Sequence, residues 1–261
     1  MLKFKLIMNK LSKPTKQDIQ SIKSSTVLES LWDSEFSGTY KLNDLSNNTK
    51  KYFTTVNSKF NKSTLLDNGC GTGRVKQFFE GKGWNCYGSD ITREGLKVAS
   101  KLCPINLLHA PAHDLPFKDN FFDVVIFWRV LHNIAKKVRK ASVRESARVL
   151  KQGGTLICCV QSKEDKSTLE KYTDNGVELD NDPNTYVVNQ KIGKEIMPYM
   201  KHFYSLDDIK NEIGTNTGLE IISIKEIEEK SGLEAVNRKI QKYWIVEAKK
   251  IHPAIQIRTK L

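Results

Sequence analysis

The sequence lacks a long apolar run, and no stretch approaches the roughly 20 residues that cross a bilayer. Its N-terminal apolar patch is interrupted by lysines and is too short for a secretory signal peptide. From these absences we expect a cytoplasmic protein without a membrane partner. The 39% of hydrophobic and 28% of charged residues are typical of a globular chain, and 261 residues suffice for one domain with an appendage.

Metal-binding motifs are also missing. Neither H-E-x-x-H nor a C-x-x-C pair occurs, so we expect no metal site. The cysteines form an odd set, and most of them lie in or beside segments that predict core strands or a glycine turn. We therefore expect reduced, buried thiols rather than disulfides at Cys70, Cys86, Cys103, Cys158 and Cys159.

Arginine is scarce, with 8 residues against 34 lysines, while the formal net charge is +12. The positive charge is concentrated at the ends: residues 1–62 hold 11 basic and 5 acidic groups, and residues 238–261 hold 7 and 1. Basic ends on a neutral core can bind a polyanion such as RNA. Because arginine is the better residue for bidentate phosphate recognition, a bias of composition toward lysine is the alternative explanation.

The stretch that organises the chain is residues 64–90, TLLDNGCGTGRVKQFFEGKGWNCYGSD. A short apolar run ends at Asp67, a glycine turn and a helical pattern follow, and a second strand ends in Asp90. A strand that turns into a helix within a few residues needs backbone conformations that only glycine adopts readily. An acid after the second strand can accept hydrogen bonds from a ribose diol. The stretch therefore predicts a nucleoside-binding crevice, with its turn built by Gly69, Gly71 and Gly73.

The spacing of these glycines separates the nucleotide-binding families. No G-x-x-x-x-G-K-[ST] phosphate loop occurs anywhere in the chain. In the G-x-G-x-x-G turn of dinucleotide-binding oxidoreductases the third small residue comes one position later than Gly73, and Arg74 occupies that position here. A nicotinamide oxidoreductase is therefore a disfavoured alternative.

The Asp-x-Gly-x-Gly-x-Gly form, led by Asp67, resembles motif I of the class I S-adenosylmethionine-dependent methyltransferases. Similar to later segments of that family are the A-H-D-L-P-F of residues 112–117, Phe122-Asp123, the V-L-H-N of residues 130–133 and the R-V-L-K-Q-G-G of residues 148–154. The similarity covers about residues 64–160. It concerns the broad group that includes the ubiquinone/menaquinone and the tRNA wobble-uridine carboxymethyl methyltransferases.

This resemblance implies S-adenosylmethionine as the cofactor, with the turn around its methionine half and Asp90 on its ribose. The family often has an aspartate before the alanine that follows the third strand, and Pro111 stands there instead. Adenine recognition would then depend on the backbone N–H of Ala112 or His113, or on Asp114. The cofactor-binding residues expected in this way are Asp67, Gly69, Cys70, Gly71, Gly73, Asp90, Ile91, Ala112, His113 and Trp128.

Methyl transfer from a sulfonium is an in-line displacement, so alignment of donor and acceptor supplies most of the catalysis, and proximity alone contributes about 7–11 kcal/mol. A base is needed only if the acceptor loses a proton. His132, just past the predicted fourth strand, is the candidate base, and a structural role is its alternative. Arg129 is a candidate partner of an acidic substrate, and a salt bridge within the protein is its alternative.

Alternating strand and helix patterns predict an α/β fold with N-terminal helices. The resemblance implies that its core is a Rossmann-like, doubly wound, seven-stranded sheet, mostly parallel with the last strand antiparallel. Trp32, Phe36 and Tyr40 share one helical face, which packs on the core or acts as a lid. After the insertion, a capping box at Ser205 predicts a helix whose residues Leu206, Ile209 and Ile213 face the core. The predicted parts are a basic arm and helical cap (1–62), the cofactor-binding core (63–160), a polar, irregular insertion covering the substrate (161–203), the rest of the core sheet (204–250) and a basic tail (251–261).

The function expected from these observations is transfer of a methyl group from S-adenosylmethionine to a small-molecule or metabolite acceptor. One alternative is an RNA (tRNA) methyltransferase that uses the basic ends. Another is a regulatory protein that binds S-adenosylmethionine without turnover. The N-terminal helices and the insertion, where the acceptor would be recognised, carry no motif that names it.

Overall fold

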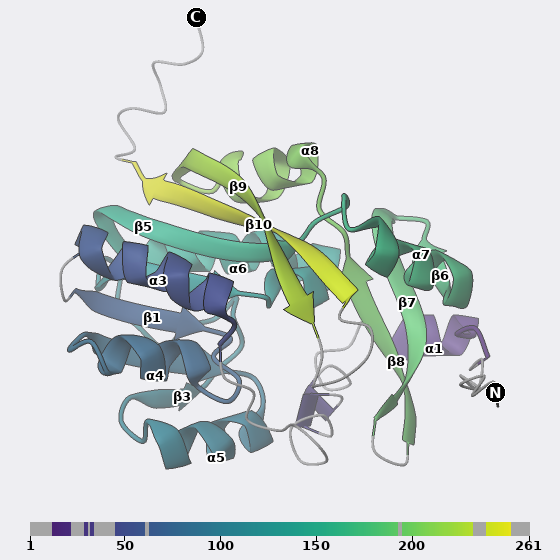
Figure 1. Cartoon of the computed structure of the whole chain (residues 1–261), viewed down its shortest axis with the longest axis horizontal. Coiled ribbons are helices and arrows are strands. Elements are labelled where there is room, and N and C mark those ends of the chain that lie inside the picture. The colour runs from purple at the N-terminus through teal and green to yellow at the C-terminus, as the bar shows by residue number, and fades with distance from the viewer. Residues whose placement is uncertain are drawn as a thin grey trace, which may run out of the picture.

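The computed structural model describes residues 12–21, 29–30, 32–33, 45–60, 63–192, 195–231 and 239–251. Within them a seven-stranded sheet has the order β3-β2-β1-β4-β5-β10-β9 (Figure 1). Strands β1 to β5 are parallel, and β10 runs antiparallel between β5 and β9. The predicted Rossmann-like sheet is thereby confirmed. Its strands are β1 (Thr64–Asn68), β2 (Asn85–Asp90), β3 (Leu107–His109), β4 (Phe122–Trp128), β5 (Leu150–Gln161), β9 (Leu219–Ser231) and β10 (Lys239–Lys250).

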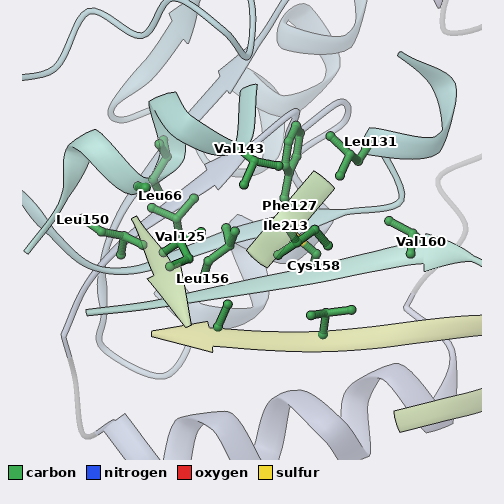
Figure 2. Packing of buried hydrophobic residues seen from close by; sticks show 14 of the residues in the cluster. Leu66, Val125, Phe127, Leu131, Val143, Leu150, Leu156, Cys158, Val160 and Ile213 are labelled. Atoms are coloured by element: carbon green, nitrogen blue, oxygen red, sulfur yellow. The ribbon is translucent and has the colours of Figure 1, made fainter. Parts of the chain in front are cut away.

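Helices cover both faces of this sheet, as a doubly wound fold requires. One face packs against α3 (Asn47–Phe60) and α4 (Arg74–Glu80), and the other against α6 (Lys136–Val149). Successive residues of β4 and β5 alternate between the two cores because side chains alternate along a strand. Figure 2 shows the α6 side, where Val125, Phe127, Leu156 and Cys158 meet Val143. The remaining elements are α1 (Lys16–Ser21), α5 (Arg93–Leu102), η1 (Leu131–Asn133), α8 (Leu206–Ile209) and η2 (Lys210–Gly214).

The insertion after β5 is regular, so the expectation of an irregular segment over 161–203 is wrong. Helix α7 (Lys166–Asn175) leads into an antiparallel sheet of β6 (Gly176–Leu179), β7 (Asp182–Ile192) and β8 (Glu195–His202). This small sheet stands beyond the carboxyl ends of the parallel strands (Figure 1). Its polar composition conceals the strands because buried residues such as Val187 and Met200 alternate with solvated neighbours.

A buried arginine joins the small sheet to the core. Arg139 on α6 is fully buried and donates to both carboxylate oxygens of Asp182 on β7, at 2.9 and 2.6 Å. Its Nε also donates to Glu212 at 2.9 and 3.0 Å, and Glu212 accepts a hydrogen bond from the Tyr204 hydroxyl. A buried arginine paired in this way holds two elements in one orientation.

Helix α8 shows one confirmed and one wrong expectation. The capping box between Ser205 and Asp208 is present, and Ile209 and Ile213 are buried. Leu206, however, is 45% exposed, because the first residue of the helix points away from the core. Strand β3 begins at Leu107, and Ile105 before it is exposed. Phe36 and Tyr40 lie outside the described residues, as do residues 1–11 and 252–261 of the basic ends. No helix in the described ranges is long and apolar enough to cross a membrane.

Candidate active site

The glycine turn has the backbone geometry that its sequence predicts. Gly69, Gly71 and Gly73 have φ values of 79°, 51° and 80°, in the left-handed region. The Gly69 N–H donates to the Ser89 carbonyl at 2.7 Å, which ties the turn to the end of β2. A Cβ on Gly69 would collide with the Val130 side chain, and neighbours also surround Gly73. Gly69 and Gly73 therefore have no room for a side chain, and the N–H groups of Gly69, Cys70, Gly71 and Gly73 are hydrogen-bonded within the protein.

Asp90 lies at the end of β2 and bridges the turn and α5. Its Oδ2 accepts the Gly71 N–H at 2.7 Å, and its Oδ1 accepts the N–H and the hydroxyl of Thr92 at 2.9 and 2.6 Å. Burial raises the pKa of this carboxyl, and these hydrogen bonds act in the opposite direction. A carboxylate has about four lone-pair sites, so the described contacts leave a site on Oδ2 for a ligand hydroxyl.

Asp67 lies beneath the turn rather than on its open side. The carboxyl is 1% exposed, and Oδ2 accepts the Lys76 N–H at 3.2 Å, in the first turn of α4. Burial raises its pKa to about 7, and the charge of Asp90 contributes to the same shift. The N-cap of α4, Gly73, has no side chain, so Asp67 supplies the hydrogen-bond acceptor for this helix end.

The segment after β3, which was predicted to contact the adenine, has fewer hydrogen bonds to the rest of the site than Asp90 has. Pro111 and Ala112 are half-buried and His113 is exposed, while the Ala112 carbonyl lies 3.5 Å from Asn68 Nδ2. The Ile91 carbonyl lies 2.7 Å from His109 Nε2 at the end of β3. Sequence analysis did not single out His109, whose contacts come from segments far from it in the sequence. Cys70 is buried in the turn, and no described contact assigns it a ligand. The cofactor roles of these residues stay predictions.

An N-terminal segment, residues 29–33, crosses the same end of the sheet; we name it the strap and describe its residues 29–30 and 32–33. The Asp33 carboxylate accepts the Glu94 N–H at the start of α5, at 3.0 Å, and the Glu29 carboxylate lies 3.3 Å from His109. On its other side, the Trp32 ring meets Tyr199 of β8 edge-to-face, with centroids 5.7 Å apart. The strap therefore joins the core sheet to the small sheet.

Trp128, the last residue of β4, and His132, in η1, make contacts with different elements. The Trp128 ring stacks on Tyr52 of α3 with centroids 5.8 Å apart, and the side chain is 8% exposed. His132 is buried, and its Nδ1 accepts the Gln161 N–H at 3.1 Å. Burial lowers the pKa of His132, and the charges of Lys201 and Arg129 add to the effect. The ring is then neutral with its proton on Nε2, which disfavours the role of general base.

Arg129 ends β4 in a left-handed conformation with φ 61°. Its guanidinium pairs with Glu229 of β9 and lies 4.3 Å from the ring centroid of Tyr243. Glu229 is 4% exposed and also accepts a hydrogen bond from the Ser46 hydroxyl at 2.9 Å. The salt bridge within the protein, one of the two interpretations of Arg129, is thus present. Glu229 was missed by sequence reasoning because 100 residues separate it from its partner.

Lys201 of β8 is the other residue that the sequence did not single out. Its Nζ lies 5.8 and 5.7 Å from the ring centroids of Tyr172 and Tyr199. The Tyr199 hydroxyl donates to Asn133 Oδ1 at 2.8 Å, and Asn133 Nδ2 donates to the Arg129 carbonyl at 3.1 Å. The only feature of the sequence that could have indicated this lysine is its position among tyrosine and histidine residues in P-Y-M-K-H-F-Y.

Sequence similarity to known proteins lies mainly in the part of the chain that forms strands β1 to β5. A family model described as "Methyltransferase domain" matches residues 66–158. The chain is 34% identical over 116 residues to a tRNA (carboxymethyluridine(34)-5-O)-methyltransferase of Arabidopsis thaliana, which covers 42% of this chain and 28% of that protein. It is 32% identical over 108 residues to a demethylmenaquinone methyltransferase of Bacillus licheniformis, covering 39% and 46%. The matches thus span less than half the length of these relatives.

The fold extends further than the sequence similarity. A crystal structure of an S-adenosylmethionine-dependent methyltransferase from Methanosarcina mazei superposes with a TM-score of 0.64, covering 80% of this chain and 99% of that one, at 19% identity. At this identity the likeness concerns the fold alone. Residues 66–158 therefore match a methyltransferase domain, and the chain shares the fold of this solved structure.

Proposed function

We propose that the protein transfers a methyl group from S-adenosylmethionine to a small-molecule acceptor. The observation that carries this proposal is the buried Asp90 carboxylate, held between the glycine turn and α5 with a lone pair to spare. A ribose hydroxyl fits that acceptor, which lies against the Gly71 N–H of the turn. The residues of this turn therefore fit the cofactor that the domain family uses.

The chain's own residues bind and orient rather than react. S-adenosylmethionine supplies an electrophilic methyl group on a sulfonium. Asp90 and the turn hold the cofactor, while the strap and β8 restrict access of water from the opposite side. Alignment and exclusion of water suffice for a displacement at methyl. His132, neutral and committed to Gln161, keeps the start of η1 in place.

A small acceptor is supported by the elements that stand at the carboxyl ends of the parallel strands. The small sheet is joined to α6 through Arg139 and to the core through the strap, so an acceptor reaches the turn between connected elements. Such an arrangement favours a compact substrate over a folded polynucleotide.

A tRNA acceptor is the second candidate. It is supported by the 34% identical Arabidopsis relative and by the net charge of +12 concentrated at the chain ends. Binding of tRNA through lysines would weaken by about a thousandfold or more between 50 and 200 mM salt if six or more phosphates are contacted. Filter binding at these two salt concentrations separates this candidate from the first.

The proposed activity is tested by calorimetric titration of S-adenosylmethionine and S-adenosylhomocysteine into the wild type and Asp90→Asn. Loss of a hydrogen bond to a charged group costs about 1.5–3 kcal/mol, so affinity should fall roughly ten- to a hundredfold. The matched control is Asp207→Asn, whose side chain is 87% exposed on α8. Absence of binding to the wild type, or equal losses in both variants, would refute the proposal, provided that circular dichroism shows folded variants.

A further inference from the structure

Lys201 lies on the face of β8 that looks toward the residues after β4. Residues at positions i and i+2 share one face of a strand, so Lys201 shares its face with Tyr199. Through Tyr199 and Asn133 it is joined by two hydrogen bonds to the Arg129 backbone, at the carboxyl end of β4. The lysine therefore belongs to the site at the strand ends, although its own strand is part of the insertion.

No carboxylate of the described residues lies within 4 Å of Lys201 Nζ. Arg129, Arg139 and Lys76 each have such a partner: Arg129 pairs with Glu229, Arg139 with Asp182 and Lys76 with Glu80. The ammonium of the half-buried Lys201 instead lies near the aromatic rings of Tyr172 and Tyr199. Partial removal of a cation from water without a counterion has a free-energy cost, so its retention points to a ligand that supplies the negative charge.

The charges around Lys201 support this assignment. Burial lowers its pKa to about 8, and the charges of Arg129 and Lys171 act in the same direction, against the charge of Asp165. Asp165 is itself occupied, because it accepts hydrogen bonds from Gln161 Nε2 and the Thr168 N–H at 2.8 and 3.0 Å. His132, the next titratable group, is neutral. The lysine is thus still mainly protonated at pH 7, and no carboxylate of the described residues pairs with it.

The walls beside the lysine are aromatic. Tyr199 meets Trp32 of the strap, and Tyr172 meets Phe203 with ring centroids 5.3 Å apart. Flat rings of this kind suit a planar organic ligand. We propose that Lys201 binds the carboxylate of a small, planar methyl acceptor, and this inference rests on the proposed function. Arg129, already paired with Glu229, acts as a positioning residue through the chain of Asn133 and Tyr199.

The probes for this site are benzoate and benzamide, which share a planar ring but differ in charge. Each is titrated by calorimetry into the protein saturated with S-adenosylhomocysteine. We expect benzoate to bind at least tenfold more tightly than benzamide. In Lys201→Met the affinity for benzoate should fall about tenfold, to the level of benzamide, while Lys191→Met, an exposed lysine on β7, should leave it unchanged.

The pH dependence of benzoate affinity gives a second readout, which would not change if Lys201 had only a structural role. Benzoate affinity of the wild type should fall between pH 7 and 9.5 as the Lys201 ammonium loses its proton, and the affinity of Lys201→Met should stay flat. The other charged or titratable groups near Lys201 among the described residues are Arg129, Asp165, Lys171, His132, Tyr172 and Tyr199. Equal binding of benzoate and benzamide, no binding of benzoate, or an unchanged Lys201→Met would overturn the inference.

Failure of this inference is distinguishable from failure of the proposed function. S-adenosylhomocysteine is titrated into the wild type and Lys201→Met before either probe is added. If both proteins bind S-adenosylhomocysteine, the variant is folded. A loss of benzoate affinity is then due to the missing Lys201 side chain. If the wild type does not bind S-adenosylhomocysteine, the proposed function fails, and the benzoate titration of the unliganded protein still decides the role of Lys201.

Discussion

Asp67 and Asp90 end neighbouring parallel strands, and both carboxyls are buried, yet their contacts give them different tasks. Asp90 accepts hydrogen bonds from the turn and from Thr92 and keeps a lone pair on the side of the turn. Asp67 accepts one backbone N–H at the start of α4. Sequence analysis predicted both residues in the cofactor site because a sequence motif does not show which way each side chain points. The structure separates the residue that can meet a ligand from the residue that supports the turn.

At this scale Asp67→Asn should make stability less dependent on pH. The pKa of the folded state is raised to about 7 from 3.8, so the ionised carboxylate destabilises the fold, and the free energy of unfolding contributed by Asp67 falls as pH rises from about 4 through 7. One pKa unit corresponds to about 1.4 kcal/mol. The variant should therefore gain about 1–3 kcal/mol relative to the wild type between pH 5 and pH 8.

Urea unfolding of both proteins at these two pH values measures the difference. Asp207→Asn, at an exposed position, serves as the control and should show no pH-dependent gain. A gain that is the same at pH 5 and pH 8 would mean that Asp67 is not the group whose ionisation costs stability.

At the scale of elements, the small sheet depends on a buried arginine. Arg139→Met should lower the free energy of unfolding by about 3–5 kcal/mol, because Asp182 and Glu212 would remain buried without their cation. Arg144→Met, an exposed position of the same helix, should cost less than about 1 kcal/mol. Urea unfolding compares the two variants.

Limited proteolysis locates the effect. In Arg139→Met, cleavage within 162–205 should precede cleavage of the core, since the ion pairs that join β7 to α6 are lost. Replacing Asp182 and Glu212 by Asn and Gln in the same chain should recover part of the stability, because no unpaired charge then remains. A variant whose small sheet is as resistant as that of the wild type would contradict the anchoring role.

At the scale of the whole molecule, the strap connects three parts that lie far apart in the sequence. Glu29 reaches β3, Asp33 reaches α5 and Trp32 reaches β8 of the small sheet. The contacts are individually modest, and an edge-to-face aromatic pair contributes about 0.5–1.5 kcal/mol. Together they hold the described strap residues against β3, α5 and β8.

Trp32→Ala should therefore release S-adenosylhomocysteine about two- to tenfold faster, since the lost aromatic pair corresponds to about 0.5–1.5 kcal/mol. Stopped-flow displacement measures the dissociation rate. Trp32→Phe keeps a ring opposite Tyr199 and should restore the slow rate. If the phenylalanine and alanine variants dissociate equally fast, the ring pair has no part in retention.

The turn of residues 64–90 and the order of strand and helix followed from the sequence, because glycine geometry and hydrophobic periodicity act over a few residues. The small sheet did not, because its strands carry many polar residues and their hydrophobic alternation is weak, although β7 and β8 pair as neighbours in the sequence. The partner of Arg129 was equally hidden. Its charge and that of Glu229 meet only when the strands pack, since Coulomb interactions depend on distance in space rather than on separation along the chain.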